Sequence, residues 1–394
     1  MPGALAPEDA ALIRAGLTVI EAQAEEMAVY FYAILFMRHP EVRGLFPRDM
    51  DVQRDRLLRA LLRIVDLVDH PDHLVRFCSR LGRDHRKFGT HHTHYAAVGE
   101  CLLDALARFA GPAWSAELAG AWQRAYAAAS RTMMLAADDD ARLRPAVWTA
   151  RVTGHRLLGR RLAAITVSPD RPYPYAAGQY VSVETPRRPK MWRHYSPAHA
   201  PRPDSTLTFH VRAVPGGQVS DALVHEAKVG DLLHLGPPEG EMVVDPQSPL
   251  DVLCVAGGTG LAPIKALIEQ LARTRTERCV DLFIGARTAQ ELYGLDDMLR
   301  MSQRHHWLTV RAAVSHQHIA GTEGSLPEVI AQYGPWDRHE VFLSGPSPMV
   351  TAAARVLAAR GVPPSRIHHD PLDVPVLSSF AEPSYARQEE TGPK

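Results

Sequence analysis

Residues 251–273, DVLCVAGGTGLAPIKALIEQLAR, decide the fold of the C-terminal part of this chain. The apolar run before Gly257 predicts a buried strand, and the residues after Gly260 have the apolar spacing of a helix. Glycines at a strand–helix junction let the backbone approach a pyrophosphate closely, and the first amides of the helix attract its negative charge. The stretch therefore predicts a dinucleotide-binding turn, although a plain tight strand–helix turn explains the same glycines.

The residues that follow continue the alternation of strand and helix. Three apolar runs read as further strands, namely CVDLFIGA (279–286), LTVRAAV (308–314) and EVFLSG (340–345). Alternating strands and helices are typical of a parallel sheet covered by helices. A second turn, made of Ser344, Gly345 and Pro346, ends one of these strands. Because the carboxyl ends of parallel strands meet at one edge, both turns are expected at a single crevice.

Residues 146–245 show a different sequence pattern, in which proline and glycine separate short runs of residues that favour β-strands. These runs are AVWTARVTGHRL (146–157), LAAITVSP (162–169), QYVSVETP (179–186), LTFHVRAV (207–214) and DLLHLGPP (231–238). Short strands with frequent turns predict a small antiparallel barrel.

The first 140 residues show helical spacing almost throughout. After helices that end near Met37, further helical patterns cover residues 52–68, 73–88, 95–109 and 114–135. The chain is therefore expected to be multi-domain: an all-α domain, an antiparallel barrel and an α/β domain with a parallel sheet. The expected bounds are residues 1–142, 146–247 and 249–376, with a disordered tail over 377–394.

Composition narrows the class of protein. The 394 residues are 46% hydrophobic and 22% charged, and the 44 basic side chains match the 44 acidic ones. A globular composition excludes a disordered chain, and a net charge of zero gives no general attraction to nucleic acid or acidic membranes. No apolar run reaches the ~18 residues of a membrane helix, and the N-terminus MPGALAPEDA is not a signal peptide.

The cysteines point to a reducing compartment. The four of them, Cys78, Cys101, Cys254 and Cys279, form no CxxC pair and sit in apolar runs. Buried thiols of a cytoplasmic protein are expected. This dispersed pattern also argues against an iron–sulfur cluster, which needs clustered cysteines.

Three C-terminal motifs and two barrel motifs, in order, resemble the ferredoxin-reductase-like flavoenzymes. The C-terminal motifs are GGTGLAPIKALI, FIGARTAQELYGLDDM and VFLSGPSPMV. Upstream, Arg193-His194-Tyr195-Ser196 resembles the RxYS flavin motif, and Gly217-Gln218-Val219-Ser220 resembles the second flavin segment. The resemblance implies an FAD barrel followed by an NAD(P) domain.

The same resemblance assigns roles to residues. Arg193 is expected on a phosphate, Tyr195 on the isoalloxazine face and Ser196 on the reactive flavin nitrogen, with His194 beside them. Tyr180 takes a second flavin position, although an amphipathic strand explains a tyrosine there equally well. Further expected cofactor contacts are Gly217 to Ser220 at the pyrophosphate, then Gly257, Gly258, Thr259, Gly260, Leu261, Ala262, Pro263, Arg287, Ser344, Gly345, Pro346, Asp370, Pro371 and Leu372.

The helical region resembles the globin domain of flavohemoglobins. The similarity lies in YFYAILFMRHPEVRGLFP (30–47), in Gln53 and His85, and in YAAVGECLL (95–103). It implies that His85 is the proximal ligand of heme b. Phe46 is expected against the heme and Leu57 on the distal wall, while Tyr32 and Gln53 donate hydrogen bonds to oxygen at the iron. Tyr95 is expected beside the proximal histidine.

The chain departs from the flavohemoglobin pattern at several positions, as a divergent, actinobacterial-type member would. Ala137 falls where the family has a glutamate near the proximal histidine, with Asp138 adjacent, and Asp84 precedes His85 in place of a lysine. A carboxylate on the imidazole would tune the iron, so its loss puts that tuning in doubt. Ser344 replaces a frequent cysteine, and Leu372 cannot stack on the flavin as an aromatic side chain does.

The remaining histidines and acids offer a further candidate for a metal site. His91, His92 and His94 form an HHTH run after Gly89-Thr90, and Asp138 to Asp140 form an acidic turn. A solvated loop is the preferred interpretation of the histidines. Lys265, in the helix after the glycine turn, is expected to be solvated.

The resemblance implies a flavohemoprotein oxidoreductase with nitric oxide dioxygenase activity. The expected cofactors are heme b, FAD and NADH, with NADPH possible, and the substrates are O₂ and nitric oxide. Arg287 alone would favour NADPH, but Glu291 one helical turn later opposes a phosphate, so NADH is preferred. The alternatives are a heme-based redox or gas sensor or heme-handling protein with a slow reductase, and a general NAD(P)H oxidase or ferric reductase. A cytoplasmic monomer or weak dimer is expected.

Overall fold

The computed structural model describes residues 6–274, 277–316 and 324–370 of the chain. The chain divides into two compact units, one containing residues up to Ala146 and the other Val147–Asp373. Pro371, Leu372 and the tail expected to be disordered lie outside the described residues. Cys279 is exposed, so the prediction of a buried thiol was wrong there, whereas Cys78, Cys101 and Cys254 are buried.

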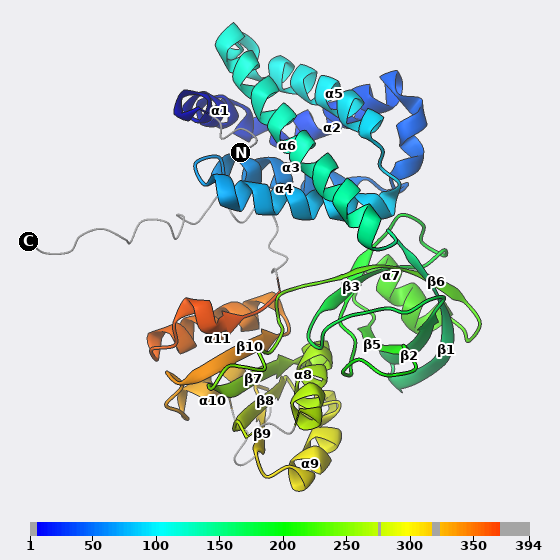
Figure 1. Ribbon diagram of the computed structural model, residues 1–394, viewed down its shortest axis with the longest axis vertical. Coiled ribbons are helices and arrows are strands. Elements are labelled where there is room, and N and C mark those ends of the chain that lie inside the picture. The colour runs from blue at the N-terminus through cyan, green and yellow to red at the C-terminus, as the bar shows by residue number, and fades with distance from the viewer. Residues whose placement is uncertain (1–5, 275–276, 317–323, 371–394) are drawn as a thin grey trace, which may run out of the picture. The chain divides into compact units, whose positions relative to one another are not determined.

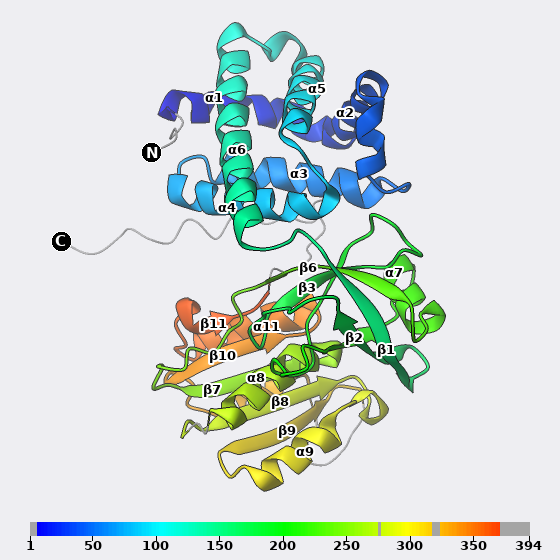
Figure 2. The same cartoon turned by 45° about the vertical axis from the view of Figure 1, so that its right-hand side comes forward.

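The first unit consists of helices (Figure 1). They are α1 (Pro7–Ile20), α2 (Ala24–Arg38), α3 (Asp51–Asp66), α4 (Pro71–His85), α5 (His92–Ala110) and α6 (Ala116–Leu143), with short 3₁₀ turns at Glu21–Gln23, Pro40–Leu45, Arg86–Phe88 and Gly111–Ala113. The long α6 crosses α4 (Figure 2) at Gly82, where a Cβ would collide with the backbone of Met133. Only glycine therefore allows these two helices to approach so closely.

Two sequence expectations in this unit were wrong. The histidine run does not form a loop, because α5 begins at His92 and the side chains of His91 and His94 cap its first turn. The acidic run at Asp138–Asp140 is not a turn but part of α6, which extends to Leu143. Within the described residues, no group of three His, Cys, Asp or Glu side chains could hold a metal ion.

The first part of the second unit is an antiparallel sheet. Its strands are β1 (Trp148–Gly159), β2 (Leu162–Pro169), β3 (Tyr180–Glu184), β4 (Arg193–Tyr195), β5 (Leu207–Arg212) and β6 (Leu232–Glu239), in the order β4-β3-β6-β1-β2-β5. A bridge between Pro197 and Phe209 joins the two ends of this order and closes the barrel. The short helix α7 (Gln218–Asp221), continued by a turn at Ala222–Glu226, follows β5.

The rest of the second unit is a parallel sheet. Its strands are β7 (Asp251–Gly257), β8 (Val280–Ala286), β9 (Leu308–Val314), β10 (His339–Ser344) and β11 (Ile367–His368), and its helices are α8 (Leu261–Arg273), α9 (Leu295–Arg304), α10 (Leu326–Ala331) and α11 (Ser347–Ala359). The order β11-β10-β7-β8-β9 reverses direction between β7 and β10. Helices α8 and α9 cover one face, and α10 and α11 cover the other (Figure 1). The predicted fold class is confirmed.

Candidate functional site

The two glycine turns of the parallel sheet meet at the point where its strand order reverses. β7 and β10 are neighbours, and Ala256 pairs with Ser344. A Cβ on Gly260 would collide with the carbonyl oxygen of Ser344, and a Cβ on Gly345 would lie 3.0 Å from the Cα of Gly257. A reversal of strand order in an open α/β sheet is where ligands bind. The two turns therefore lie side by side, as expected from the sequence.

The glycine turn leaves its outer side open. Gly258 has a φ of +54°, which side chains other than glycine's rarely adopt. A Cβ added there would meet nothing within 4 Å. Helix α8 begins directly after the turn, at Leu261. The start of α8 therefore follows a turn that no side chain covers at Gly258, which is the arrangement that a pyrophosphate-binding turn requires.

The end of β8 carries the candidate contact for the adenosine ribose. Arg287 follows Ala286, and its guanidinium lies 3.2 Å from the carboxylate of Glu291. The Arg287 side chain is 71% exposed and that of Glu291 is 32% exposed. Glu291, which is expected to repel a 2′-phosphate, therefore pairs with Arg287, the residue that would bind that phosphate.

The flavin motif lies on β4, beside β3. Tyr180, the first residue of β3, is buried, and its ring centroid lies 4.6 Å from that of His194. The Tyr180 hydroxyl donates to Glu239, 3.3 Å away, which is its partner across the β3–β6 ladder. Asp370 reaches the same place, because its Oδ1 atom lies 2.9 Å from where a Cβ on Gly240 would stand. Three positions predicted around the flavin, Tyr180, His194 and Asp370, thus lie near one another, and Glu239 and Gly240 join them from a fourth segment of the chain.

The other residues expected at the flavin make contacts close in sequence. Burial raises the pKa of Tyr195 to about 12, so its hydroxyl keeps its proton at neutral pH. Arg193 donates to the carbonyl of Trp192 at 2.9 Å. Ser220 accepts from the amide of Val214 at 3.2 Å and donates to the carbonyl of Gly217 at 2.9 Å. Ser220 thus closes the turn that starts α7, in addition to the predicted pyrophosphate contact.

In the helical unit, Tyr32 lies at the centre of an aromatic cluster. It is 6% exposed, and the rings of Phe31, Phe36 and Phe46 surround it at centroid distances of 4.8–5.8 Å. Its hydroxyl donates to the backbone carbonyl of Gln53 at 3.4 Å. Burial raises the pKa of Tyr32 to about 12, so the hydroxyl remains a proton donor. Leu57 packs against the same core.

His85 ends α4 and is oriented by its own helix. Its Nδ1 atom lies 2.7 Å from the carbonyl of Leu81, which assigns the proton to Nδ1 and leaves Nε2 as the basic nitrogen. Burial lowers the pKa of His85, which favours the neutral imidazole. The ring of Tyr95 lies 6.4 Å away, and Tyr126 donates to the Tyr95 carbonyl at 2.5 Å. A neutral, oriented imidazole is the form that binds a metal.

The carboxylates near His85 have other partners. Asp138 pairs with Nε2 of His92 at 3.0 Å, and Asp84 forms an ion pair with the buried Lys87. Burial, with a contribution from the negative charge of Asp138, raises the pKa of Tyr95 to about 12. Among the described residues, the Leu81 backbone carbonyl, and not a carboxylate, is the hydrogen-bond partner of His85. The departure at Ala137 is therefore not compensated by a bond from Asp138 to His85.

Two groups of residues near the candidate site give no signal in the sequence. Glu239 carries no motif, and only the register of β3 against β6 could have placed it beside Tyr180. Lys265 was expected to be solvated, which was wrong, because its side chain is 21% exposed and pairs with Glu269. The apolar stems of long charged side chains can pack on a helix face while their charged ends find partners, so hydrophobic periodicity does not predict such a pair.

Three family models of known proteins match consecutive segments of the chain. A globin family model matches residues 29–133, an oxidoreductase FAD-binding domain matches residues 160–244 and an oxidoreductase NAD-binding domain matches residues 254–355. These domains support the predicted cofactors heme, FAD and NAD(P)H.

Relatives extend over nearly the whole chain. The chain is 27% identical to a flavohemoprotein of Bordetella pertussis over 401 residues, covering 92% of this chain and 97% of that protein. It is 35% identical over 223 residues to the xylene/toluene monooxygenase electron transfer component XylA of Pseudomonas putida, of whose length it spans 63%. A flavohemoglobin from Malassezia yamatoensis, solved with bound FAD and heme, shares the fold with a TM-score of 0.80 at 19% identity, covering 93% of this chain and 99% of that one.

The order of the three domains identifies the class of enzyme. FAD- and NAD-binding reductase domains make the chain a flavohemoprotein oxidoreductase. None of the helices in the described ranges is both long and apolar enough to cross a membrane. With a globin domain before its reductase domains and homologues of the same architecture along its length, the chain belongs to the flavohemoglobin family.

Proposed function

We propose that this protein is a nitric oxide dioxygenase that uses NADH. The observation that carries the proposal is the buried, protonated hydroxyl of Tyr32 within an aromatic cluster of a globin domain, on a chain that also has a reductase. In a pocket that excludes water, this hydroxyl can turn from the Gln53 carbonyl, 3.4 Å away, to donate to oxygen and stabilise the negative charge that develops there. A reductase on the same chain supplies the electrons that such a reaction consumes.

The residues of the helical unit fit a heme. His85 offers the unprotonated Nε2 of an oriented imidazole, which is the donor that heme iron takes from a globin. The buried side chains of this unit form two separate clusters, one with Tyr32 and Leu61 and one with Cys78 and Met133. A flat apolar group between the helices that carry these clusters is consistent with this division. His85 would hold the iron, with Phe46 and Leu57 excluding water.

The reductase residues fit FAD and a dinucleotide. Tyr195 and Arg193 lie two residues apart on β4, and Tyr180 on the neighbouring strand β3 packs against His194. A Cβ added to Gly258 would meet nothing within 4 Å, as a turn that approaches a pyrophosphate requires. When bound, these groups and the heme supply the electron transfer and oxygen chemistry of the reaction. The chain's part is to orient the nicotinamide through the glycine turns, to hold the flavin through β3 and β4, and to keep the Tyr32 proton in place.

Electron balance sets the expected stoichiometry. Nitric oxide and O₂ together contain every atom of nitrate and lack one electron. NADH gives up two electrons, so each NADH supports the formation of two nitrate ions. The ion pair between Arg287 and Glu291 supports NADH over NADPH, because Glu291 repels a 2′-phosphate and occupies the arginine that would bind it.

The test is the rate of nitric oxide consumption by the full-length protein, loaded with heme and FAD, in aerobic buffer with NADH. Catalytic turnover that needs both NADH and O₂ supports the proposal. NADH oxidation that proceeds equally fast without nitric oxide indicates a general oxidase instead. A single turnover followed by arrest indicates a sensor with a slow reductase.

A further inference from the structure

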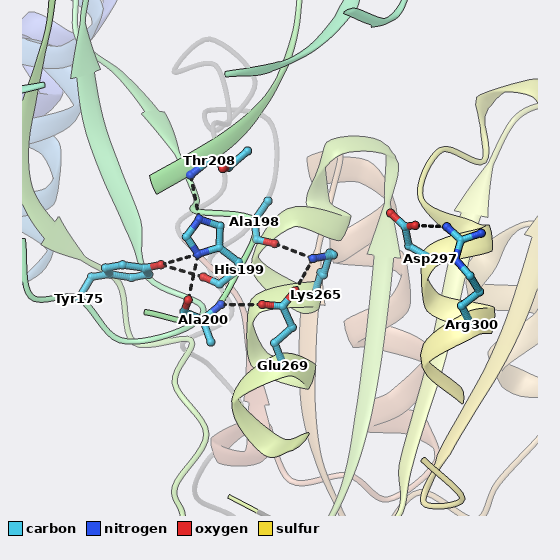
Figure 3. Close-up of polar contacts among 9 residues, drawn as sticks. All are labelled: Tyr175, Ala198, His199, Ala200, Thr208, Lys265, Glu269, Asp297 and Arg300. Atoms are coloured by element: carbon cyan, nitrogen blue, oxygen red, sulfur yellow. Dashed lines mark hydrogen bonds and ion pairs between the residues drawn. The ribbon is translucent and has the colours of Figure 1, made fainter. Parts of the chain in front are cut away.

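A polar cluster joins α8 of the NAD-binding domain to the barrel segment that follows the flavin motif (Figure 3). Lys265 and Glu269 lie one turn apart on α8 and form an ion pair, with side chains 21% and 17% exposed. The Oε2 atom of Glu269 accepts the amide of Ala200 at 3.1 Å, and Nζ of Lys265 donates to the carbonyl of Ala198 at 3.3 Å. The pair therefore holds the backbone on both sides of His199.

His199 anchors the same segment to the barrel. It is 1% exposed, and its Nε2 accepts the backbone amide of Thr208 on β5 at 3.1 Å. The proton must then lie on Nδ1, which faces the carbonyl of Ala200 at 2.9 Å. The Tyr175 hydroxyl donates to the His199 carbonyl at 2.9 Å. Both ring nitrogens and the carbonyl oxygen of His199 are thus engaged (Figure 3).

The position of the cluster links two parts of the active site. Ala198 lies two residues after Ser196 of the flavin motif, and Lys265 lies one turn into the helix that begins after the glycine turn. The single helix α8 therefore follows the dinucleotide turn at its start, and one turn later its side chains bind the backbone of residues 198–200, just after the flavin motif. Ala200 also packs into the apolar core formed by α8 and β7.

We propose that Lys265 and Glu269 form a clamp that positions the nicotinamide against the flavin for hydride transfer. The step breaks a C–H bond of NADH and passes the hydrogen with its electron pair to the flavin, leaving NAD⁺. It needs reacting atoms about 3–3.5 Å apart, and a misplacement of about 1 Å can cost about a hundredfold in rate. An apolar contact would join the domains as firmly, whereas hydrogen bonds to two backbone groups also fix their orientation.

The clamp rests on the NADH-to-FAD part of the proposed function and is tested by anaerobic stopped-flow reduction of the flavin in the complete protein. Glu269→Ala removes the acceptor for the Ala200 amide, and we expect the limiting rate of flavin reduction to fall about tenfold to a hundredfold. FAD content and the Kd for NADH should stay within about twofold of the wild type, since neither residue is placed on either cofactor. Glu269→Gln keeps an acceptor and should recover most of the rate.

Two further variants complete the test. Lys265→Met removes the donor to Ala198 and should slow the same step while FAD is retained. The matched control is Asp297→Asn, which breaks an ion pair with Arg300 on the surface of α9, at 58–59% exposure (Figure 3), and should leave the rate unchanged.

An unchanged limiting rate in Glu269→Ala would overturn the clamp. A rate that falls only in step with lost FAD, and returns when FAD is added, would also overturn it, because the pair would then be merely structural. A wild-type protein whose flavin NADH does not reduce would contradict the proposed function itself, and with it the clamp.

Discussion

Replacing Tyr32 by phenylalanine tests the oxygen pocket with the least disturbance to the fold. The hydroxyl makes a 3.4 Å bond to the carbonyl of Gln53, which is long for a hydrogen bond. A neutral bond contributes about 0.5–1.5 kcal/mol, and this one should fall at the low end, so thermal stability should change little. The ring contacts with Phe31 and Phe46 remain in the variant.

The expected effect on oxygen is larger than the effect on folding. A hydrogen bond to a group that carries charge contributes about 1.5–3 kcal/mol, which corresponds to about tenfold to a hundredfold in a dissociation constant. We therefore expect O₂ to dissociate at least about tenfold faster from Tyr32→Phe than from the wild type, measured by stopped-flow mixing of the oxygenated protein with a ligand that replaces O₂. Tyr30→Phe is the matched control, because Tyr30 packs against Phe109 and Arg108. Equal dissociation rates in wild type and Tyr32→Phe, or a larger effect in Tyr30→Phe, would refute the assignment.

Four other outcomes are expected. His85→Ala should abolish stoichiometric heme binding while FAD is retained, measured by absorbance, and a heme-replete variant would reject His85 as the ligand. NADH should give a higher kcat/KM for flavin reduction than NADPH, and if NADPH proves better, its advantage should vanish in Arg287→Ala. Gly260→Ala should raise the KM for NADH about tenfold, since overpacking costs about 1–3 kcal/mol, and an unchanged KM would argue against the crevice. Although burial opposes ionisation, basic neighbours hold the pKa of Glu340 below its usual range. The stabilisation by its carboxylate is therefore present above the unfolded pKa and is lost as pH falls below about 4–5. On acidification the Tm of Glu340→Gln should fall less than that of the wild type, and parallel curves of Tm against pH would contradict this.

Much of the fold follows from local pattern. DVLCVA and the strands after it are continuous apolar runs because a parallel sheet covered on both faces buries both sides of each strand. Their order in the sheet did not follow from the sequence, since it depends on pairs such as Asp251 and His339, which are far apart in the chain. The histidine run was misassigned because the helix-capping role of His91 and His94 is rare for histidine and gives no usual capping signal.

The candidate site was predictable where a motif occupies consecutive residues. Gly257 to Gly260 and Arg193 to Ser196 are such motifs, and the structure places each at the end or edge of its sheet. Glu239 and the pair of Lys265 and Glu269 were not predictable, because their partners come from other strands or from another domain. Side chains whose partners are far away in the chain form no motif with a regular spacing, so the sequence alone does not reveal them.

The ratio of nitrate formed to NADH oxidised, in aerobic buffer with nitric oxide, tests the central claim most directly. Electrons that pass from NADH through one chain to the conversion of nitric oxide and O₂ into nitrate require two nitrate ions for each NADH. We expect this ratio over many turnovers of the protein loaded with heme and FAD. A ratio near zero while NADH is consumed, or nitrate that stops at one equivalent of protein, would contradict a nitric oxide dioxygenase.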